Sequence, residues 1–191
     1  MAGGVFAASL SGPERLPELV TERLVLRELV PGDAPAVASG AGDRRVAQYL
    51  IAVPSPYPIA LARRWVRHRI EWWEAGRGVT FAIAARGRSD ELLGTVSLRR
   101  YVRDRRAELG YWLAARAWGR GLATEAARAI VAFAFDELRL PRLICLFEPE
   151  NTASRRVAEK VGMTFERMAV IEGDEGPLYS MTRPSQPTRD S

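Results

Sequence analysis

The chain contains very little lysine, histidine or cysteine. Lys160, His68 and Cys145 are the only residues of their types among 191. A single cysteine cannot form an intramolecular disulfide, which favours a reducing compartment, so we expect a cytoplasmic protein. One histidine and one cysteine also fall short of the ligand set of a zinc site, so we expect no metal.

Long apolar runs are absent as well. No run approaches the ~20 residues of a membrane-spanning helix, and no basic segment precedes the short apolar patch near the amino terminus, as a signal peptide requires. The net charge of +5 can indicate nucleic-acid binding. In 103–108, however, arginines are interleaved with carboxylates, which is typical of a solvated surface. We therefore expect neither a membrane nor a nucleic-acid partner.

The composition fits a single globular domain. The chain is 47% hydrophobic and 27% charged, and it is long enough to bury a sizeable core. We expect an amino-terminal tail over 1–20, one domain over 21–183, and a polar, disordered tail over 184–191, which contains two prolines.

The most informative segment is a glycine-rich turn at 116–121, which leads into an apolar helical pattern at 122–138. The first N–H groups of a helix lack intrahelical partners, and the helix dipole adds positive charge there. Gly119 and Gly121 carry no side chain, so a phosphate can come close to the backbone. The turn therefore predicts a pyrophosphate site for a nucleotide-like cofactor. The alternative is a plain loop in which the glycines only supply unusual dihedral angles.

The flanks of this turn predict a strand–helix–strand unit. Apolar and other residues alternate over 106–113, which indicates a strand, and 143–147 is a continuous apolar run, typical of a strand buried on both faces. Further along, Asn151 precedes an amphipathic helical pattern, and Gly162 stands where a helix would end.

Other periodic segments complete the expected fold. We expect strands at about 21–28, 79–85, 91–100, 164–171 and 177–183, and helices at about 33–42, 58–75 and 152–161. The resulting fold class is α/β, of the mixed α+β kind, with a mostly antiparallel sheet and one parallel pair.

Two of these segments resemble the signatures of the GNAT superfamily of N-acetyltransferases. Arg116, Gly119 and Gly121 match its acetyl-CoA pyrophosphate pattern Arg/Gln-x-x-Gly-x-Gly/Ala, and Asn151 and Ser154 match its Asn-x-x-Ser pattern. The segments 21–27, 93–98 and 108–113 are similar to the branch of ribosomal-protein N-terminal acetyltransferases (RimJ/RimL-like). The resemblance covers about residues 21 to 183 and extends over most of the chain.

The resemblance implies an acetyl-CoA-dependent enzyme that acetylates a primary amine, either a protein N-terminus or a small molecule. It also implies a GNAT fold, in which the parallel strands splay apart and hold the acyl arm of the cosubstrate, and it makes a homodimer plausible by family analogy. The expected cofactor-binding residues are Leu113, Arg116, Gly119, Arg120, Gly121, Leu122, Ala123, Thr124, Asn151, Ser154 and Arg155.

Glu108 and Ser154 are the catalytic candidates. Glu108 lies on the strand before the turn and is a candidate general base that takes a proton from the incoming amine. The alternative is a surface carboxylate that pairs with Arg99, Arg105 or Arg106. Ser154 is a candidate to stabilise the departing thiolate, whereas Asn151 can serve as a helix N-cap without any ligand.

Aromatic residues are the candidates for binding the acceptor amine. Tyr57, Trp72 and Trp112 are candidate substrate-binding residues, although aromatic residues at helical spacing are more often core. A polyamine acceptor would require an acidic cleft, and the 43–60 loop offers only Asp43. A non-catalytic acyl-CoA-binding regulatory module remains the alternative function.

Overall fold

The computed structural model describes residues 16–101, 106–171 and 173–184. Both expected tails lie mainly outside these ranges, and so does Arg105, one of the expected partners of Glu108. Across the described residues, no helix is both long and apolar enough to cross a membrane.

The elements follow the order expected from the periodicity. The strands are β1 (Leu19–Val20), β2 (Leu24–Glu28), β3 (Gly78–Ala85), β4 (Arg88–Tyr101), β5 (Arg106–Leu113), β6 (Arg142–Leu146), β7 (Thr164–Ile171) and β8 (Asp174–Thr182). The helices are α1 (Ala34–Ala41), α2 (Arg44–Ala47), α3 (Ile59–Glu74), α4 (Leu122–Ala132) and α5 (Thr152–Lys160), with short 3₁₀ turns at Pro31–Asp33 and Ala115–Ala117.

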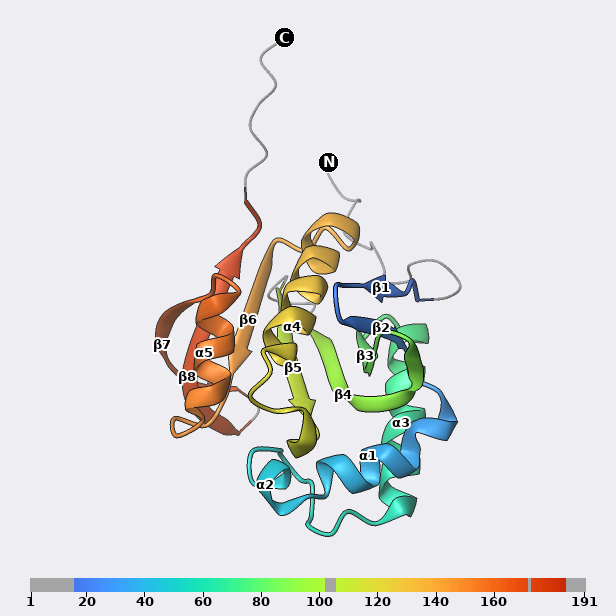
Figure 1. The fold of residues 1–191 in the computed structure, drawn as a ribbon. Helices are drawn as coiled ribbons and strands as arrows, with labels where there is room; N and C mark the ends of the chain where they lie inside the picture. Colours follow the sequence, from blue (N-terminus) through green and yellow to red (C-terminus); the bar gives the residue numbers. More distant parts are fainter. Residues whose placement is uncertain (1–15, 102–105, 172, 185–191) are drawn as a thin grey trace.

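The described strands form one sheet in the order β1-β2-β3-β4-β5-β6-β8-β7. Its neighbouring strands are antiparallel except for β5 and β6, which are parallel. The predicted fold class, a mixed sheet with one parallel pair, is therefore confirmed (Figure 1).

The parallel strands pair only at their beginnings. The register joins Ala107 to Leu143 and Glu108 to Ile144 and extends no further. Beyond this point β5 and β6 separate toward their carboxyl ends, as Figure 1 shows. None of the described strands therefore lies beside this edge of β5 over the second half of its length.

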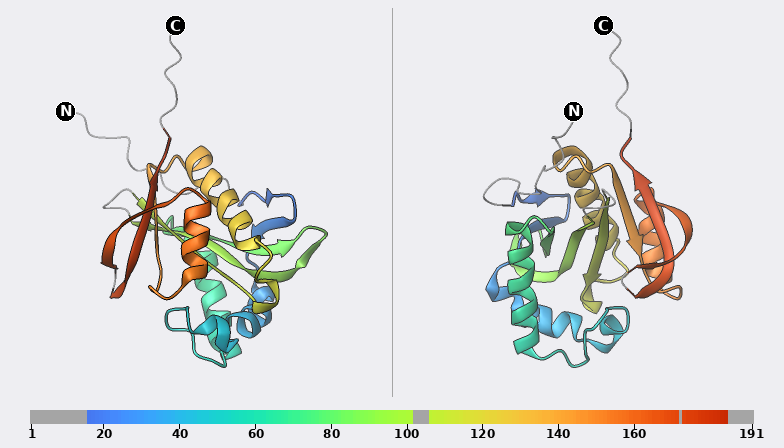
Figure 2. Two further views of the ribbon diagram at one scale, coloured as in Figure 1. Left: turned by 60° about the vertical axis from the view of Figure 1, so that its left-hand side comes forward. Right: turned by 180° about the vertical axis from the view of Figure 1, so that it is seen from behind.

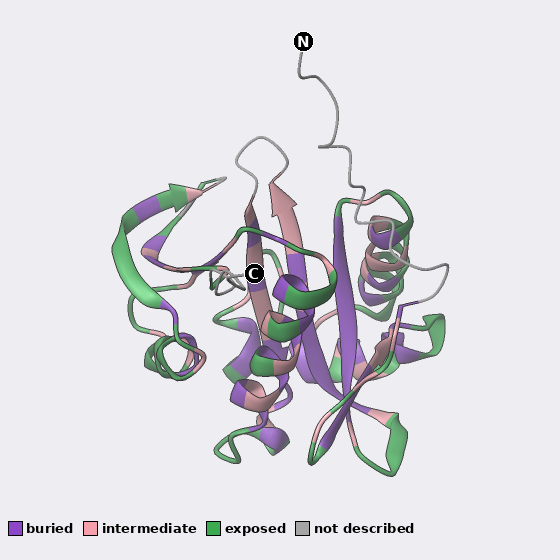
Figure 3. Ribbon diagram, turned by 90° about the horizontal axis from the view of Figure 1, so that it is seen from above, coloured by how far each residue is buried: buried purple, intermediate pink, exposed green. Residues whose placement is uncertain are grey.

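Helices cover both faces of the sheet. α4 lies on one face, where Ile130 and Phe133 pack with strand residues such as Leu109 and Phe81. α1 and α3 pack against the other face and bury Trp112, and α3 lies in front of the sheet in the rear view of Figure 2. Figure 3 shows that the central strands are buried while the outer sides of the helices are exposed.

Two boundaries differ from the sequence predictions. The domain begins before residue 21, because Leu16 is 8% exposed in the core and β1 pairs with β2. A two-residue strand is too short to leave a periodic pattern, so the sequence did not indicate it. The α-helix expected over 122–138 ends at Ala132, and a π-helical turn continues it over Phe133–Glu137.

Candidate active site

The glycine turn opens α4 as predicted. Gly119 and Gly121 have φ angles of 73° and 75°, in the left-handed region that favours glycine. Gly121 is the N-cap of α4, and its carbonyl accepts a hydrogen bond from the Glu125 amide at 3.1 Å. The amides of 122–124 therefore precede the first intrahelical bond. A Cβ at Gly119 would have no atom of the described residues within 4 Å, so the surface above the turn is open.

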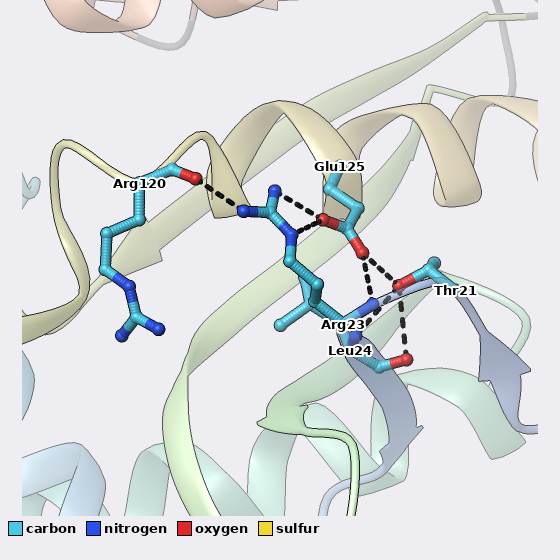
Figure 4. Close-up of polar contacts among 5 residues, drawn as sticks. All are labelled: Thr21, Arg23, Leu24, Arg120 and Glu125. Atoms are coloured by element: carbon cyan, nitrogen blue, oxygen red, sulfur yellow. Dashed lines mark hydrogen bonds and ion pairs between the residues drawn. The ribbon is translucent and has the colours of Figure 1, made fainter.

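A polar network fastens this turn to the start of the sheet (Figure 4). The Glu125 carboxylate accepts hydrogen bonds from the Thr21 hydroxyl at 2.6 Å and the Arg23 amide at 2.8 Å, and it forms an ion pair with the Arg23 guanidinium at 2.6 Å. Arg23 also donates to the Arg120 carbonyl at 2.9 Å. Burial alone would raise the pKa of Glu125, but the donors from Thr21 and Arg23 outweigh it and lower that pKa.

Arginines surround the turn. A depression of about 380 Å³ beside it is lined by Arg23, Arg86, Arg88, Arg116 and Arg120, among others. Arg116 is already engaged, because it donates to the Leu92 carbonyl at 3.0 Å and contacts Glu91 at 3.3 Å. The Arg120 side chain is exposed and points away from the network in Figure 4. This concentration of positive charge at a helix N-terminus suits an anionic ligand.

The open edge of β5 provides backbone groups beside the turn. In an antiparallel pair, successive residues alternate between bonding the partner strand and facing away from it. The Ala114 amide bonds the Leu93 carbonyl of the β4 side at 2.8 Å, so Leu113 and Tyr111 face the gap toward β6. The Leu113 carbonyl accepts a hydrogen bond from the Trp118 indole at 2.7 Å, and the Leu113 amide points into the gap.

The start of α5 closes the far side of this gap. The Asn151 side chain accepts a hydrogen bond from the Ser154 amide at 3.0 Å, so the expected N-cap role of Asn151 is confirmed. The Tyr111 hydroxyl donates to the Ser154 carbonyl at 3.3 Å, which links β5 to α5. Arg155 is exposed and pairs with Glu159 along the helix at 2.9 Å.

Tyr111 was not among the site residues predicted from the sequence. Burial raises the pKa of its hydroxyl far above the usual range, nearby Cys145 adds to the shift, and a hydrogen bond with the Ser154 side chain opposes it. The hydroxyl therefore stays protonated at neutral pH and lies beside Ser154. The sequence did contain an indication of this residue, because Tyr111 places a hydroxyl on a strand face that is otherwise apolar.

Glu108 lies on the opposite face of β5, together with Gly110 and Trp112. Its carboxylate accepts a hydrogen bond from the Tyr101 hydroxyl at 2.6 Å and lies 4.0 Å from Arg99. The pairing with Arg99 that the sequence suggested is therefore present, but the Glu108 side chain is still 20% exposed. The carboxylate is thus held in place and remains accessible.

The space above Gly110 is open. A Cβ there would have only the Ser97 hydroxyl, at 3.3 Å, within 4 Å. Because Gly110 lies between Glu108 and Trp112 on the same face of β5, this opening is beside the candidate base.

The three predicted acceptor residues are in different environments. Trp112 is 8% exposed and packs against Gly40 of α1, so it belongs mainly to the core. Trp72 is half-buried on α3, where its indole donates to His68 at 3.0 Å. Tyr57 is also half-buried, and its Cβ lies 2.8 Å from where a Cβ on Gly42 would stand.

The Cys145 thiol and possible metal ligands are the other groups that could carry chemistry. Burial raises the pKa of the Cys145 thiol to about 12, so this thiol stays protonated at neutral pH. No three histidine, cysteine or acidic side chains in the described ranges are grouped so that they could hold a metal ion.

Comparison with known proteins identifies the family. The model of the acetyltransferase (GNAT) domain matches residues 23–164. YkkB of Bacillus subtilis, an uncharacterized protein, is 37% identical over 110 residues, which cover 55% of this chain and 64% of YkkB. An uncharacterized N-acetyltransferase of Bacillus licheniformis, p20, is 30% identical over 158 residues, which cover 82% of this chain and 86% of p20.

A solved structure shows the same fold. Mycobacterium smegmatis RimJ in complex with CoA-disulfide matches with a TM-score of 0.72 at 23% identity, over 83% of this chain and 81% of that one. The open parallel pair, the glycine turn and the family match agree, and the chain belongs to the GNAT family of N-acetyltransferases.

Proposed function

We propose that this protein transfers an acetyl group from acetyl-CoA to a primary amine by direct attack of the amine on the thioester. The observation that carries the proposal is the opening between β5 and β6, which pair at only two positions and then diverge beside the amino terminus of α4. An extended acyl arm can add to the exposed edge of β5 as a further strand would.

The residues around the turn fit the anionic part of CoA. The open space above Gly119, the free helix amides and the arginines beside them match the requirements of a pyrophosphate. Gly119, Gly121 and the amides of 122–124 would hold the pyrophosphate, with Arg120 beside them. Arg155 is a second basic candidate for the cofactor, and bound acetyl-CoA supplies an acetyl group activated as a thioester.

The residues that take part in the proposed reaction lie on both faces of β5 and at its open edge. Glu108 accepts a proton from the acceptor ammonium, directly or through a water molecule, since an ordinary glutamate is a weak base. The Leu113 amide polarises a carbonyl oxygen that lies in the gap. Ser154 stabilises negative charge on a departing sulfur, and we add Tyr111, whose protonated hydroxyl lies beside Ser154, to this role.

The acceptor in this proposal is either a small-molecule amine or a protein N-terminus. RimJ and RimL structures share the fold at under 25% identity, and this likeness does not carry their acceptors over. A polyamine is less suited, because Asp43, the acidic residue of the loop before α3, is already paired with Arg45 at 2.5 Å. A cytoplasmic location and a homodimer stay predictions.

The alternative function is a regulatory module that binds acyl-CoA without turnover. It would need the turn and the gap but not an accessible base, and Glu108 is both accessible and positioned. This accessibility favours the enzyme.

Calorimetric titration with acetyl-CoA, followed by a free-thiol assay against a panel of amines and N-terminal peptides, separates the two functions. Binding together with thiol release on an acceptor is the expected result. Binding without release on the whole panel would favour the regulatory module. Absence of binding by the folded protein would refute the proposal for the turn.

A further inference from the structure

The guanidinium of Arg69, on α3, contacts two aromatic rings. Its guanidinium lies 4.0 Å from the centroid of the Trp72 ring and 5.2 Å from that of Trp65. Trp72 is itself fixed, because it donates to His68 and packs closely over Gly78 of β3. Stacking on rings positions a guanidinium without using its hydrogen-bond donors.

Among the described residues, none pairs with those donors. The Nε atom of Arg69 is buried without a hydrogen bond, and none of the ion pairs in the described ranges includes Arg69. Such a donor carries an unfavourable desolvation cost unless a ligand or water satisfies it. Arg27, by comparison, has a bidentate contact with Asp33 at 2.7 and 2.9 Å.

The guanidinium keeps its charge at neutral pH. Burial lowers the pKa of Arg69 to about 10, and repulsion from Arg99 adds to this shift, while attraction to Glu108 and Tyr57 opposes it. Ring contacts place the group on the Glu108 side of the sheet. The Trp72 ring that contacts Arg69 also lies 5.9 Å from the Arg99 guanidinium, and Arg99 is 4.0 Å from the Glu108 carboxylate. The opening above Gly110 lies beside Glu108 on that side.

We propose that Arg69 binds an anionic group of the acceptor, so that the preferred substrate is a primary amine with a carboxylate close to the amine. The inference rests on the proposed acetyl transfer and specifies its acceptor. An acceptor of this kind matches both charges at the site, because its ammonium faces Glu108 while its carboxylate faces Arg69. A guanidinium binds a planar carboxylate through two parallel hydrogen bonds, and a purely cationic acceptor would be repelled.

A pair of amidated tetrapeptides tests this specificity, Ser-Asp-Ala-Ala and Ser-Asn-Ala-Ala. They differ only in one negative charge next to the amino terminus. Binding is followed by tryptophan fluorescence in the presence of CoA, since Trp65 and Trp72 flank Arg69, and turnover is followed by thiol release from acetyl-CoA. We expect the aspartate peptide to bind about tenfold more tightly or better, the effect of one charged hydrogen-bonded contact.

The variants assign that preference to one side chain. Arg69→Gln should abolish the preference, so that the two peptides bind with similar affinity, while the affinity for acetyl-CoA stays unchanged. Arg67→Gln is the matched control, because Arg67 is exposed two residues earlier on the same helix and should keep the preference. Wild type that binds both peptides equally, or Arg69→Gln that still prefers aspartate, would overturn the proposal.

The outcomes separate this proposal from the enzymatic one. A preference for the aspartate peptide without thiol release would support the anion site and count against acetyl transfer. Thiol release from both peptides at equal efficiency would support acetyl transfer and overturn the role of Arg69.

Discussion

Gly121→Ala provides a quantitative test of the cofactor turn. Gly121 has a φ of 75°, and the nearest atom to an added Cβ is a nitrogen of the Arg23 guanidinium at 3.7 Å, an ordinary contact. The substitution therefore adds backbone strain without a clash. For a residue other than glycine, this conformation costs about 1–2 kcal/mol.

The free-energy cost of this strain can appear either as lost stability of the fold or as lost affinity for acetyl-CoA. If the turn keeps its shape, the variant loses about 1–2 kcal/mol of stability and binds acetyl-CoA as wild type does. If the turn relaxes, the fold keeps most of its stability, but the amides at the start of α4 move. The affinity for acetyl-CoA then falls by about 5- to 30-fold, because the same free energy is lost from binding. We expect the second result, because no described side chain caps α4 at Gly121, and the bond from Arg23 that fastens the turn at the Arg120 carbonyl is exposed to solvent.

The assay combines thermal unfolding with calorimetric titration of acetyl-CoA. Gly173→Ala is the control, since Gly173 has a φ of 99° and open space around it in the turn between β7 and β8. This control should lose stability and keep full affinity. A Gly121→Ala protein with both properties unchanged would refute the reasoning, because the strain would then have no effect anywhere.

Three further predictions concern single side chains. Glu108→Gln should lower kcat at least tenfold, in line with general-base catalysis, and leave acetyl-CoA affinity unchanged in calorimetry; an unchanged kcat would exclude the base role. Tyr111→Phe should slow thiol release and keep the fold by circular dichroism, whereas an undiminished rate would leave the hydroxyl only its contact with α5. Glu125→Gln should lower the melting temperature at neutral pH. Because folding lowers the pKa of Glu125, its contribution is complete above the ordinary value of 4.5 and is lost as the pH falls through the folded pKa, so the two melting curves should converge in acid. A constant difference across this range would contradict the network.

The strand–turn–helix–strand unit was predictable because local patterns determine it. Alternation over β5, paired glycines before α4 and a continuous apolar run in β6 each depend on neighbours in sequence. The same holds for Asn151, whose capping bond spans three residues. The sequence also indicated both catalytic candidates, and the structure brings Ser154 to the gap and leaves Glu108 accessible on the other face.

The roles that we propose for Tyr111 and Arg69 were not predictable, because they depend on distant elements. Tyr111 contacts Ser154 of α5, which lies forty-three residues further along the chain. Arg69 appears as one of several arginines on an amphipathic helix, and only the packed structure separates it from its exposed neighbours. The partner of Glu125 was missed for the same reason, since Arg23 is about a hundred residues away.

The two faces of β5 have a consequence for the kinetics of the proposed reaction. Glu108 and Tyr111 are three residues apart on one strand and point to opposite sides of the sheet. Glu108 lies by Arg99, which contacts Trp72 of α3, and Tyr111 contacts Ser154 of α5. Cosubstrate and acceptor would then enter from different sides and meet only where β5 and β6 have parted. Neither ligand has to pass the other, so the order of addition is not imposed by access, and either binary complex can proceed to the ternary complex.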